Sequence, residues 1–208
     1  MAKQIEGVYE KLLACARTEF LEKGYTDASL REIAAKANTT TGSIYTRFGG
    51  KEGVFRAVVE PAADRMKTVF LEIQEMFHGF GAERQRSKVG KYTANSMGQI
   101  LDVIYADFDA FRLLLDASYG TLYQNFVNDL VEIEVDYTYK FIQVIGNETV
   151  VSGRITREII HIVVTAYMNG LFEVVRHNMD REDAGRYIDL LSKYHKAGFC
   201  TILGFTID

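Results

Sequence analysis

The sequence predicts an all-α protein with a small N-terminal domain of three helices, followed by a larger helical domain. Apolar residues recur at three- and four-residue spacing along most of the chain, which is the period of amphipathic helices. A single proline in 208 residues argues against a fold built from many tight turns. The helical segments are short up to about residue 50 and long after it. We therefore expect about nine helices, in two domains that comprise residues 1–50 and 51–208.

The first helix is predicted to extend to Gly24. Its buried stripe consists of apolar residues at helical spacing, namely Val8, Leu12, Leu13, Ala16, Phe20 and Leu21. A glycine after such a stripe commonly stops a helix, because glycine adopts the left-handed conformation without strain.

The second helix is predicted over about 30–37, from a capping signal at its start. Ser29, with Glu32 three residues later, has the pattern of a capping box, in which each side chain accepts a hydrogen bond from the backbone N–H of the other residue. Asn38 lies where the chain must turn, since asparagine tolerates the left-handed conformation.

The third helix, over about 41–48, places polar groups on its outer side. Ile44 and Phe48 lie four residues apart and share the face toward the core, and the glycine pair after Phe48 ends the helix. The outer side carries groups that suit hydrogen bonds to phosphates and base edges: Thr39, Thr40, Thr41, Gly42, Ser43, Tyr45 and Arg47. With the preceding helix it forms a helix-turn-helix, which predicts binding to double-stranded DNA.

The larger domain is predicted to begin with a long helix from Lys51. Pro61 lies within this helix and should bend it, because proline removes one backbone hydrogen bond. The segment HGFGAERQRSKVGK, residues 78–91, is expected to be a loop and a flexible connection. The remaining helices are predicted near 92–107, 109–117, 121–145, 155–178 and 182–205.

Charge is distributed unevenly along the chain. Residues 1–56 hold nine Lys/Arg and seven Asp/Glu, and the remainder holds fifteen and twenty-one, so +2 and −6 sum to the net charge of −4. A slightly basic end can approach a polyanion while an acidic body stays away from it. No apolar run is long enough to suggest a signal peptide or a membrane span, so a soluble cytoplasmic protein with no membrane partner is expected.

The segment SLREIAAKANTTTGSIYTRFGGKEGVF resembles the DNA-binding segment of the TetR family of transcriptional repressors. The family pattern is close to T-x-x-x-I-A-x-x-A-G-V-S-x-G-x-x-Y-x-H-F-x-S-K, and the Ile-Ala pair, the Gly-x-x-Tyr-x-x-Phe motif and the lysine are in register. The resemblance implies a repressor that binds a palindromic operator as a homodimer and is released by a small-molecule inducer. It also implies phosphate contacts by Thr40, Tyr45 and Lys51, and contacts to the backbone or bases by Ser29 and Arg31.

Four positions depart from the family pattern. Asn38 replaces the usual glycine, Thr39 a valine, Arg47 a histidine or tyrosine, and Gly50 a serine or asparagine. Arg47 adds a charge, and Gly50 weakens the cap of the next helix. None breaks the motif, but together they leave the operator sequence open.

Nothing in the larger domain predicts catalysis. The histidines show no metal-ligand spacing: His78, His161, His177 and His195. Without a nucleophile–base set or a phosphate-binding glycine loop, we expect no enzymatic activity, cofactor or metal. Glu132, Glu134 and Asp136 alternate along one predicted helix and are interpreted as a solvated face. Two alternatives stay open: an all-α enzyme or ligand-binding protein with a pocket in the C-terminal domain, and an adaptor whose head binds protein.

The last two predicted helices are expected to form the interface of a homodimer. The helix over 155–178 is apolar on two sides, with Ile159, Val163, Tyr167 and Leu171 on one and Ile160, Val164 and Met168 on the other. A helix that needs cover on two faces is often covered by a partner chain. The final helix offers apolar and small residues for close packing: Leu190, Leu191, Tyr194, Ala197, Gly198, Thr201 and Phe205.

A small, largely apolar or aromatic inducer is expected to bind in the larger domain. The resemblance supplies the idea of an inducer, and the sequence supplies apolar walls with a few polar anchors. The candidate lining residues are Phe70, Phe77, Met97, Leu101, Tyr105, Phe108, Phe111, Tyr123, Phe126, His161, Tyr167, Met168 and Phe172. A ligand against Phe70 or Phe77 would move the long helix, and the bend at Pro61 would pass the motion to the N-terminal domain.

Overall fold

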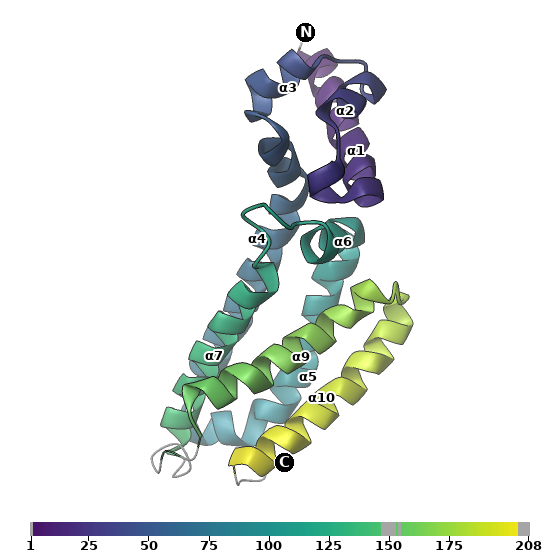
Figure 1. The fold of residues 1–208 in the computed structure, drawn as a ribbon. Coiled ribbons are helices and arrows are strands. Elements are labelled where there is room, and N and C mark those ends of the chain that lie inside the picture. Colours follow the sequence, from purple (N-terminus) through teal and green to yellow (C-terminus); the bar gives the residue numbers. More distant parts are fainter. Residues whose placement is uncertain (1, 147–152, 154, 204–208) are drawn as a thin grey trace. The chain divides into compact units, whose positions relative to one another are not determined.

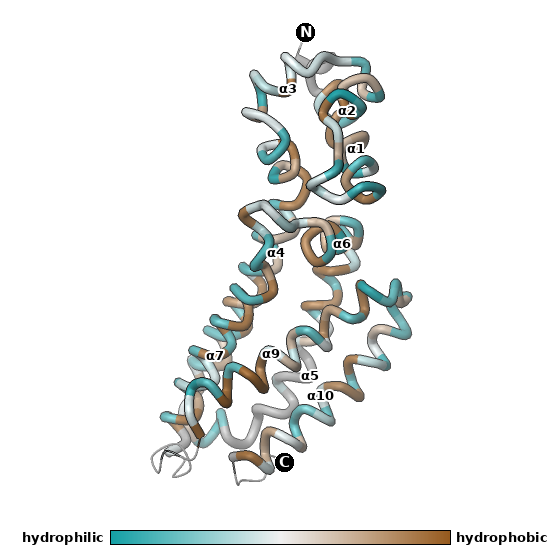
Figure 2. Tube along the Cα trace, in the orientation of Figure 1, coloured by the Kyte–Doolittle hydropathy of each residue, from teal (hydrophilic) through white to brown (hydrophobic). Residues whose placement is uncertain are grey.

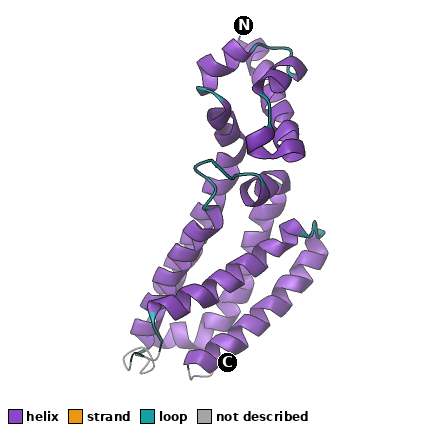
Figure 3. Ribbon diagram, in the orientation of Figure 1, coloured by secondary structure: helices purple, strands orange, loops and turns teal. Residues whose placement is uncertain are grey.

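The computed structural model describes the backbone of residues 2–146, 153 and 155–203, which consists of helices joined by turns (Figures 1 and 3). No β-strand occurs in this part of the chain, and the predicted all-α fold is confirmed. In chain order the helices are α1 (Ala2–Asp27), α2 (Leu30–Lys36), α3 (Thr41–Phe48), α4 (Lys51–His78), α5 (Ala82–Ala106), α6 (Phe108–Asp116), α7 (Phe126–Ile145), α9 (Arg157–Arg176) and α10 (Arg181–Leu203).

The chain divides into two compact units. The first comprises Met1–Arg65 and Asp107–Phe126, and the second comprises Met66–Ala106 and Val127–Asp208. Helix α4 therefore contributes its first part to one unit and its second part to the other. The three N-terminal helices share their unit with α6, which is distant from them in sequence and packs against α1.

An ion pair fastens α6 to α1 within the first unit. Asp107 is the N-cap of α6, and its side chain accepts a hydrogen bond from the backbone N–H of Ala110. The same carboxylate takes both terminal nitrogens of Arg17 in a bidentate pair, with Nη2 2.8 Å from Oδ2. One aspartate thus starts a helix and holds it against α1, an arrangement that the sequence pattern did not reveal.

The short helices of the first unit begin and end at the predicted residues. Ser29 and Thr40 are the N-caps of α2 and α3, and each side chain accepts a hydrogen bond from the backbone N–H three residues later, at 3.4 and 3.1 Å. Asn38 and Gly49 have left-handed backbones with φ of 56° and 75°. Gly24 is non-helical as well, although the hydrogen bonding of α1 continues to Asp27. The predicted turn signals are therefore confirmed.

Helix α5 begins at Ala82, so the loop predicted over 78–91 is wrong. Only residues 79–81 connect α4 to α5. The segment after Gly81 is rich in unbranched Glu, Arg, Gln and Lys, which are strong helix formers. Gln85 closes the corner, since its side-chain nitrogen donates a hydrogen bond to the carbonyl oxygen of Phe80 at 2.8 Å.

Residues 117–125 form a corner between α6 and α7, where the sequence had predicted a helix from 121. Ser118 and Thr121 are buried there, and their hydroxyls donate to the carbonyl oxygens of Leu114 and Ser118, both at 2.7 Å. Such side-chain bonds to the backbone compete with a continuing helix. Helix α7 consequently begins only at Phe126.

Each unit has its own apolar core. In the first unit, Ile33 of α2 and Ile44 of α3 are fully buried, and Phe20 of α1 meets Phe55 of α4 edge-to-face with ring centroids 5.1 Å apart. In the second unit α10 packs against both α5 and α9. The apolar core of α1, α2 and α3, which together we call the head, is thus completed by side chains of α4.

Helix α9 is rich in apolar residues and carries brown stretches along its length in Figure 2. By length and composition α9 could cross a membrane, contrary to the expectation that no apolar run in the sequence is long enough. Its buried residues include Ile160, Val164, Leu171 and Phe172. Because a core helix of a globular domain has the same composition, we interpret α9 as a core helix.

Candidate nucleic-acid interface and ligand cavity

Helix α3 presents a polar face away from the core of the first unit. Ile44 is fully buried, whereas Tyr45 is 59% exposed on the next position. Gly42, Ser43 and Arg47 are exposed as well. Thr40 caps the helix while its hydroxyl also lies 3.0 Å from that of Ser43. This fixed, exposed row of hydroxyl and aromatic groups can meet phosphates and base edges.

Arg47 has a partner on α1 that the sequence did not indicate. Its guanidinium lies over the ring of Tyr9, 4.2 Å from the centroid, and this ring stacks on Phe48 at 5.7 Å. A cation over an aromatic face is worth about 0.5–1 kcal/mol at an exposed site. Arg47 is therefore oriented by α1 and keeps its exposed position at the end of α3.

Lys51 is engaged within the first unit. Its ammonium donates hydrogen bonds to the carbonyl oxygens of Thr26 and Ala28, at 2.8 and 3.1 Å, and lies 4.9 Å from the ring centroid of Tyr25. An ammonium has three N–H donors, so one remains for a phosphate. Substitution of Lys51 would therefore disturb the fold of the head as well as any phosphate contact.

The corner between α3 and α4 is tight. A Cβ at Gly53 would lie 1.7 Å from the carbonyl oxygen of Phe48, so only glycine fits in this first turn of α4. The backbone of α4 consequently starts directly against the end of α3.

The remaining predicted DNA contacts, Ser29, Arg31, Thr39 and Thr41, lie at the starts of α2 and α3. Arg31 is exposed and the other three are half-buried. The capping box predicted around Ser29 is only half correct, because the backbone N–H of Ser29 donates to Glu19 Oε1 at 3.3 Å and not to Glu32. Glu19 was not recognised from the sequence.

Glu19 is fully buried and joins three elements of the head. Its carboxylate accepts hydrogen bonds from Lys23 at 2.7 Å and Lys36 at 3.0 Å, in addition to the N–H of Ser29. These bonds, above all the one from Lys23, lower the pKa of Glu19 to about 2. A buried glutamate on an otherwise apolar stripe of the first helix was the available signal.

Glu19→Gln is expected to destabilise the protein by about 1–2 kcal/mol at pH 7. The substitution replaces the charge-assisted hydrogen bonds of the carboxylate by neutral ones, while both lysines can still reach water. Since the folded pKa is depressed, the contribution of Glu19 is present above pH 4.5 and is lost as the pH falls toward 2. Chemical denaturation at pH 7 and pH 3 measures both effects. Glu22→Gln, on the exposed side of α1, is the control, and an equal loss in the two variants would contradict the role of Glu19.

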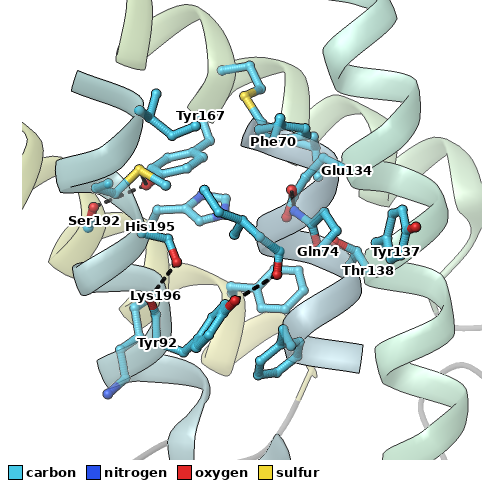
Figure 4. A pocket seen from close by; sticks show the side chains of 18 of the residues that line it. Phe70, Gln74, Tyr92, Glu134, Tyr137, Thr138, Tyr167, Ser192, His195 and Lys196 are labelled. Carbon is cyan, nitrogen blue, oxygen red and sulfur yellow. Dashed lines mark hydrogen bonds between the residues drawn. The ribbon is translucent and has the colours of Figure 1, made fainter. Parts of the chain in front are cut away.

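The second unit encloses a cavity of about 430 Å³ that α4, α5, α7, α9 and α10 line (Figure 4). This volume lies within the usual range of small-molecule sites, about 300–1,000 Å³. Its apolar lining residues are Phe70, Ile73, Phe77, Met97, Ile100, Phe141, Val164, Met168 and Phe199. The polar and aromatic-polar ones are Gln74, His78, Tyr92, Ser96, Glu134, Tyr137, Thr138, Tyr167, Asp189, Ser192, Lys193, His195 and Lys196.

Five of the predicted ligand contacts line this cavity, namely Phe70, Phe77, Met97, Tyr167 and Met168. The others lie elsewhere. Leu101 and Phe172 are buried outside its lining, and His161 pairs with Glu132 at 3.2 Å. The hydroxyl of Tyr105 donates to the carbonyl oxygen of Met179 at 2.8 Å. Four belong to the first unit: Phe108, Phe111, Tyr123 and Phe126.

His195 lies within a stack of aromatic rings at the cavity. Its ring centroid is 4.2 Å from that of Tyr167 and 5.8 Å from that of Phe199. Burial lowers the pKa of His195 to about 4, so the imidazole is neutral at pH 7. The hydroxyl of Tyr167 lies 3.0 Å from that of Ser192, which fixes the ring beside it.

Glu134 lines the same cavity, so the interpretation of Glu132, Glu134 and Asp136 as one solvated face is wrong. Glu132 and Asp136 are exposed and pair with Arg157. Successive helical residues are rotated by about 100°, so a residue two positions away lies on the opposite side. Glu134 accepts a hydrogen bond from Gln74 at 2.5 Å, and its burial raises its pKa to about 7.

Large apolar side chains remain exposed on α9 and α10. They are Ile159, Ile162, Leu190, Tyr194 and Ile202. Ala166, Ala197 and Gly198 are exposed small residues on the same two helices, which run side by side (Figure 1). Phe205, also expected in the interface, lies outside the described residues. We call the surface formed by these exposed apolar and small residues of the two helices the α9–α10 apolar face.

A capped helix-turn-helix with an exposed polar second helix, in a chain whose described part is helical, is typical of DNA-binding transcription regulators. Residues 12–58 match the family model of bacterial regulatory proteins, tetR family. This match and the TetR-type relatives support the resemblance to the TetR family noted in the sequence.

Curated relatives are similar to the chain in its N-terminal part. It is 40% identical over 60 residues to an uncharacterized HTH-type transcriptional regulator, YvdT, of Bacillus subtilis (strain 168), which covers 29% of this chain and 31% of the relative. It is 32% identical over 69 residues to the HTH-type transcriptional repressor BepR of Brucella suis biovar 1, which covers 33% of each. The alignments thus span about a third of the length of these curated relatives.

Solved structures resemble nearly the whole chain. SmeT, the repressor of the Stenotrophomonas maltophilia multidrug efflux pump SmeDEF, has a TM-score of 0.60 at 19% identity, with 91% of this chain and 88% of that chain covered. The fatty acid degradation regulator FadR from Bacillus halodurans has a TM-score of 0.54 at 16% identity, with 95% of each chain covered. At these identities the likeness is one of fold.

Proposed function

We propose that this protein is a transcriptional repressor that binds a palindromic operator as a homodimer and is released by a small molecule. In this proposal residues 1–50 form the DNA-binding domain, and residues 51–208 form the domain for ligand binding and dimerisation. The observation that carries the proposal is the exposed polar face of α3, held by a closed apolar head.

Helix α3 is the element that we place in the major groove. It is short, so it covers only a few base pairs, and a dimer with half-sites about one helical turn or more apart supplies the rest. Tyr45 is the contact least compromised by other roles, since Lys51 and Arg47 both have partners within the head. We therefore assign Tyr45 to a phosphate and Lys51 to a combined role.

The cavity of the second unit is the site that we propose for the inducer. It combines aromatic walls with a few polar anchors, as ligand sites do. Helix α4 supplies both Lys51 at its start and Phe70, Gln74 and Phe77 at the cavity. A ligand releases DNA only by its differential affinity for two states, so it must bind the released state more tightly. We propose that the signal travels along α4, with Pro61 as a hinge.

Tyr45→Ala is expected to weaken binding to duplexes selected from a random pool by about tenfold, the effect of one hydrogen bond to a charged phosphate. The loss should be similar across sequences, and the salt dependence should stay unchanged because tyrosine is neutral. Fluorescence anisotropy at several salt concentrations measures both quantities.

The matched control is Tyr119→Ala, which removes a tyrosine that is 81% exposed in the corner between α6 and α7. This variant should bind DNA like the parent. If Tyr45→Ala also binds like the parent, α3 is not the DNA-binding surface.

A further inference from the structure

Two acids line the cavity. One of them, Glu134, has no cationic partner among the described residues. Its carboxylate accepts a hydrogen bond from the neutral amide of Gln74 at 2.5 Å, and Thr138 is its second neutral donor. The other acid of the lining, Asp189, pairs with Lys193 at 2.6 Å. A carboxylate without a countercharge in such a place is costly, so it needs an explanation.

The lining beside Glu134 is mainly aromatic. The exposed Lys140 lies outside this lining, with its ammonium 4.2 Å from the ring centroid of Tyr137. The lining includes Phe70, Phe77, Tyr137 and Phe141 from α4 and α7, and Figure 4 shows Glu134 beside Gln74 and Thr138. His195 and His78, the two histidines of the lining, both have lowered pKa values because burial disfavours their charged forms. The remaining cations are Lys193 and Lys196 of α10, and Lys193 is already paired with Asp189.

Aromatic faces and a carboxylate are complementary to one kind of ligand. The face of an aromatic ring attracts a cation, and a carboxylate does so more strongly, whereas both disfavour an anion. From this juxtaposition we propose that the cavity binds an organic monocation with an aromatic or apolar body, whose charge is placed against Glu134. This inference rests on the proposed ligand site and names the class of its ligand.

An anionic amphiphile is the main competitor for the cavity. Its head group would pair with Lys196, whose nitrogen lies toward the edge of the lining in Figure 4, away from Glu134. Its tail would then have to cover Glu134 with apolar groups and no new partner. Such an arrangement leaves the carboxylate without compensation, and for this reason the cation is favoured.

Tetraphenylphosphonium and tetraphenylborate test the sign of the ligand, because they have the same shape and opposite charge. Isothermal titration calorimetry in potassium-free sodium buffer, without DNA, measures their binding to the full chain. We expect the cation to bind at least about tenfold more tightly than the anion, the effect of one desolvated charge pair. This comparison uses only the unmodified protein and therefore holds even if a variant fails to fold.

Glu134→Gln keeps the shape of the side chain and removes its charge. It should lower the affinity for tetraphenylphosphonium at least about tenfold and leave that for tetraphenylborate unchanged or higher. Glu132→Gln, on the exposed side of the same helix, is the matched control and should bind both probes like the parent. Anion binding equal to or tighter than cation binding, or cation binding unaffected by Glu134→Gln, would overturn the proposal.

Failure of the ligand class and failure of the proposed function give different results. Release of a selected DNA duplex by tetraphenylphosphonium is measured separately, by anisotropy. Glu134-dependent binding without DNA release supports the ligand class and contradicts the proposed induction. DNA binding that involves Tyr45, with no preference for the cation, keeps the regulator and overturns the ligand class.

Discussion

A glutamate at Leu190 or Tyr194 should yield a monomer in sedimentation velocity and lower the affinity for a selected palindromic duplex by more than about a hundredfold. Leu190 and Tyr194 are 66% and 79% exposed on α10, within the α9–α10 apolar face. A charge buried there in a dimer costs several kcal/mol unless it is paired. In the proposed mode of binding each α3 contacts one half-site, so a monomer would lose the second half of the specific contacts.

The choice of these two positions follows from exposure. Leu190 and Tyr194 are four residues apart and share one side of α10, and Ile162 of α9 is exposed to a similar degree. Ala197 and Gly198 lie one turn further on and would let a partner helix approach closely. Exposed apolar side chains at helical spacing are typical of a surface that a second copy covers.

Met76→Glu is the matched control for the dimer experiment. Met76 is an exposed large apolar residue of the second unit that lies on α4, outside the α9–α10 apolar face. This variant should remain dimeric and bind DNA like the parent. Dimers of both α10 variants would place the interface on another surface of the chain.

The head of the protein could be predicted from its sequence because its signals are local. Ser29, Asn38, Thr40 and Gly49 each determine a turn or a helix end through their own backbone and side-chain preferences, and the structure has all four in those roles. What remained unrecognised are contacts between distant residues. The link from Arg17 to Asp107 spans 90 positions, and no local pattern reports it.

The cavity could be predicted only in part, for a different reason. Phe70 and Phe77 were identified because aromatic residues at helical spacing point inward, but Phe111 and Phe126 satisfy the same rule and pack within the first unit. Apolar character says that a side chain is buried, and the tertiary arrangement decides whether it lines a cavity. Glu134 is the exception, since its rotation relative to Glu132 and Asp136 was available from the helical period alone.

Because Glu134 lies at the cavity with a raised pKa, we expect the unliganded protein to lose stability as the pH rises. The pKa of Glu134 is raised from 4.5 to about 7 by burial, so the folded state holds this proton more tightly than the unfolded state. Between these values the unfolded chain releases the proton while the folded chain keeps it. Stability therefore falls as the pH rises from 4.5 through 7, and above this window the loss is complete.

Glu134→Gln should consequently make the protein more stable at pH 8, by about 1–3 kcal/mol, and change its stability little at pH 5. A shift from 4.5 to about 7 corresponds to at most about 3 kcal/mol, and the amide of glutamine fits the same site without a charge. His78, His195, Asp189, Lys193 and Lys196 also face the cavity, but they are common to both proteins and cancel in the difference. Urea denaturation of parent and variant at the two pH values gives this difference directly. A variant that is less stable than the parent at pH 8 would mean that the carboxylate is satisfied in the unliganded cavity, and the need for a cationic ligand to compensate it would disappear.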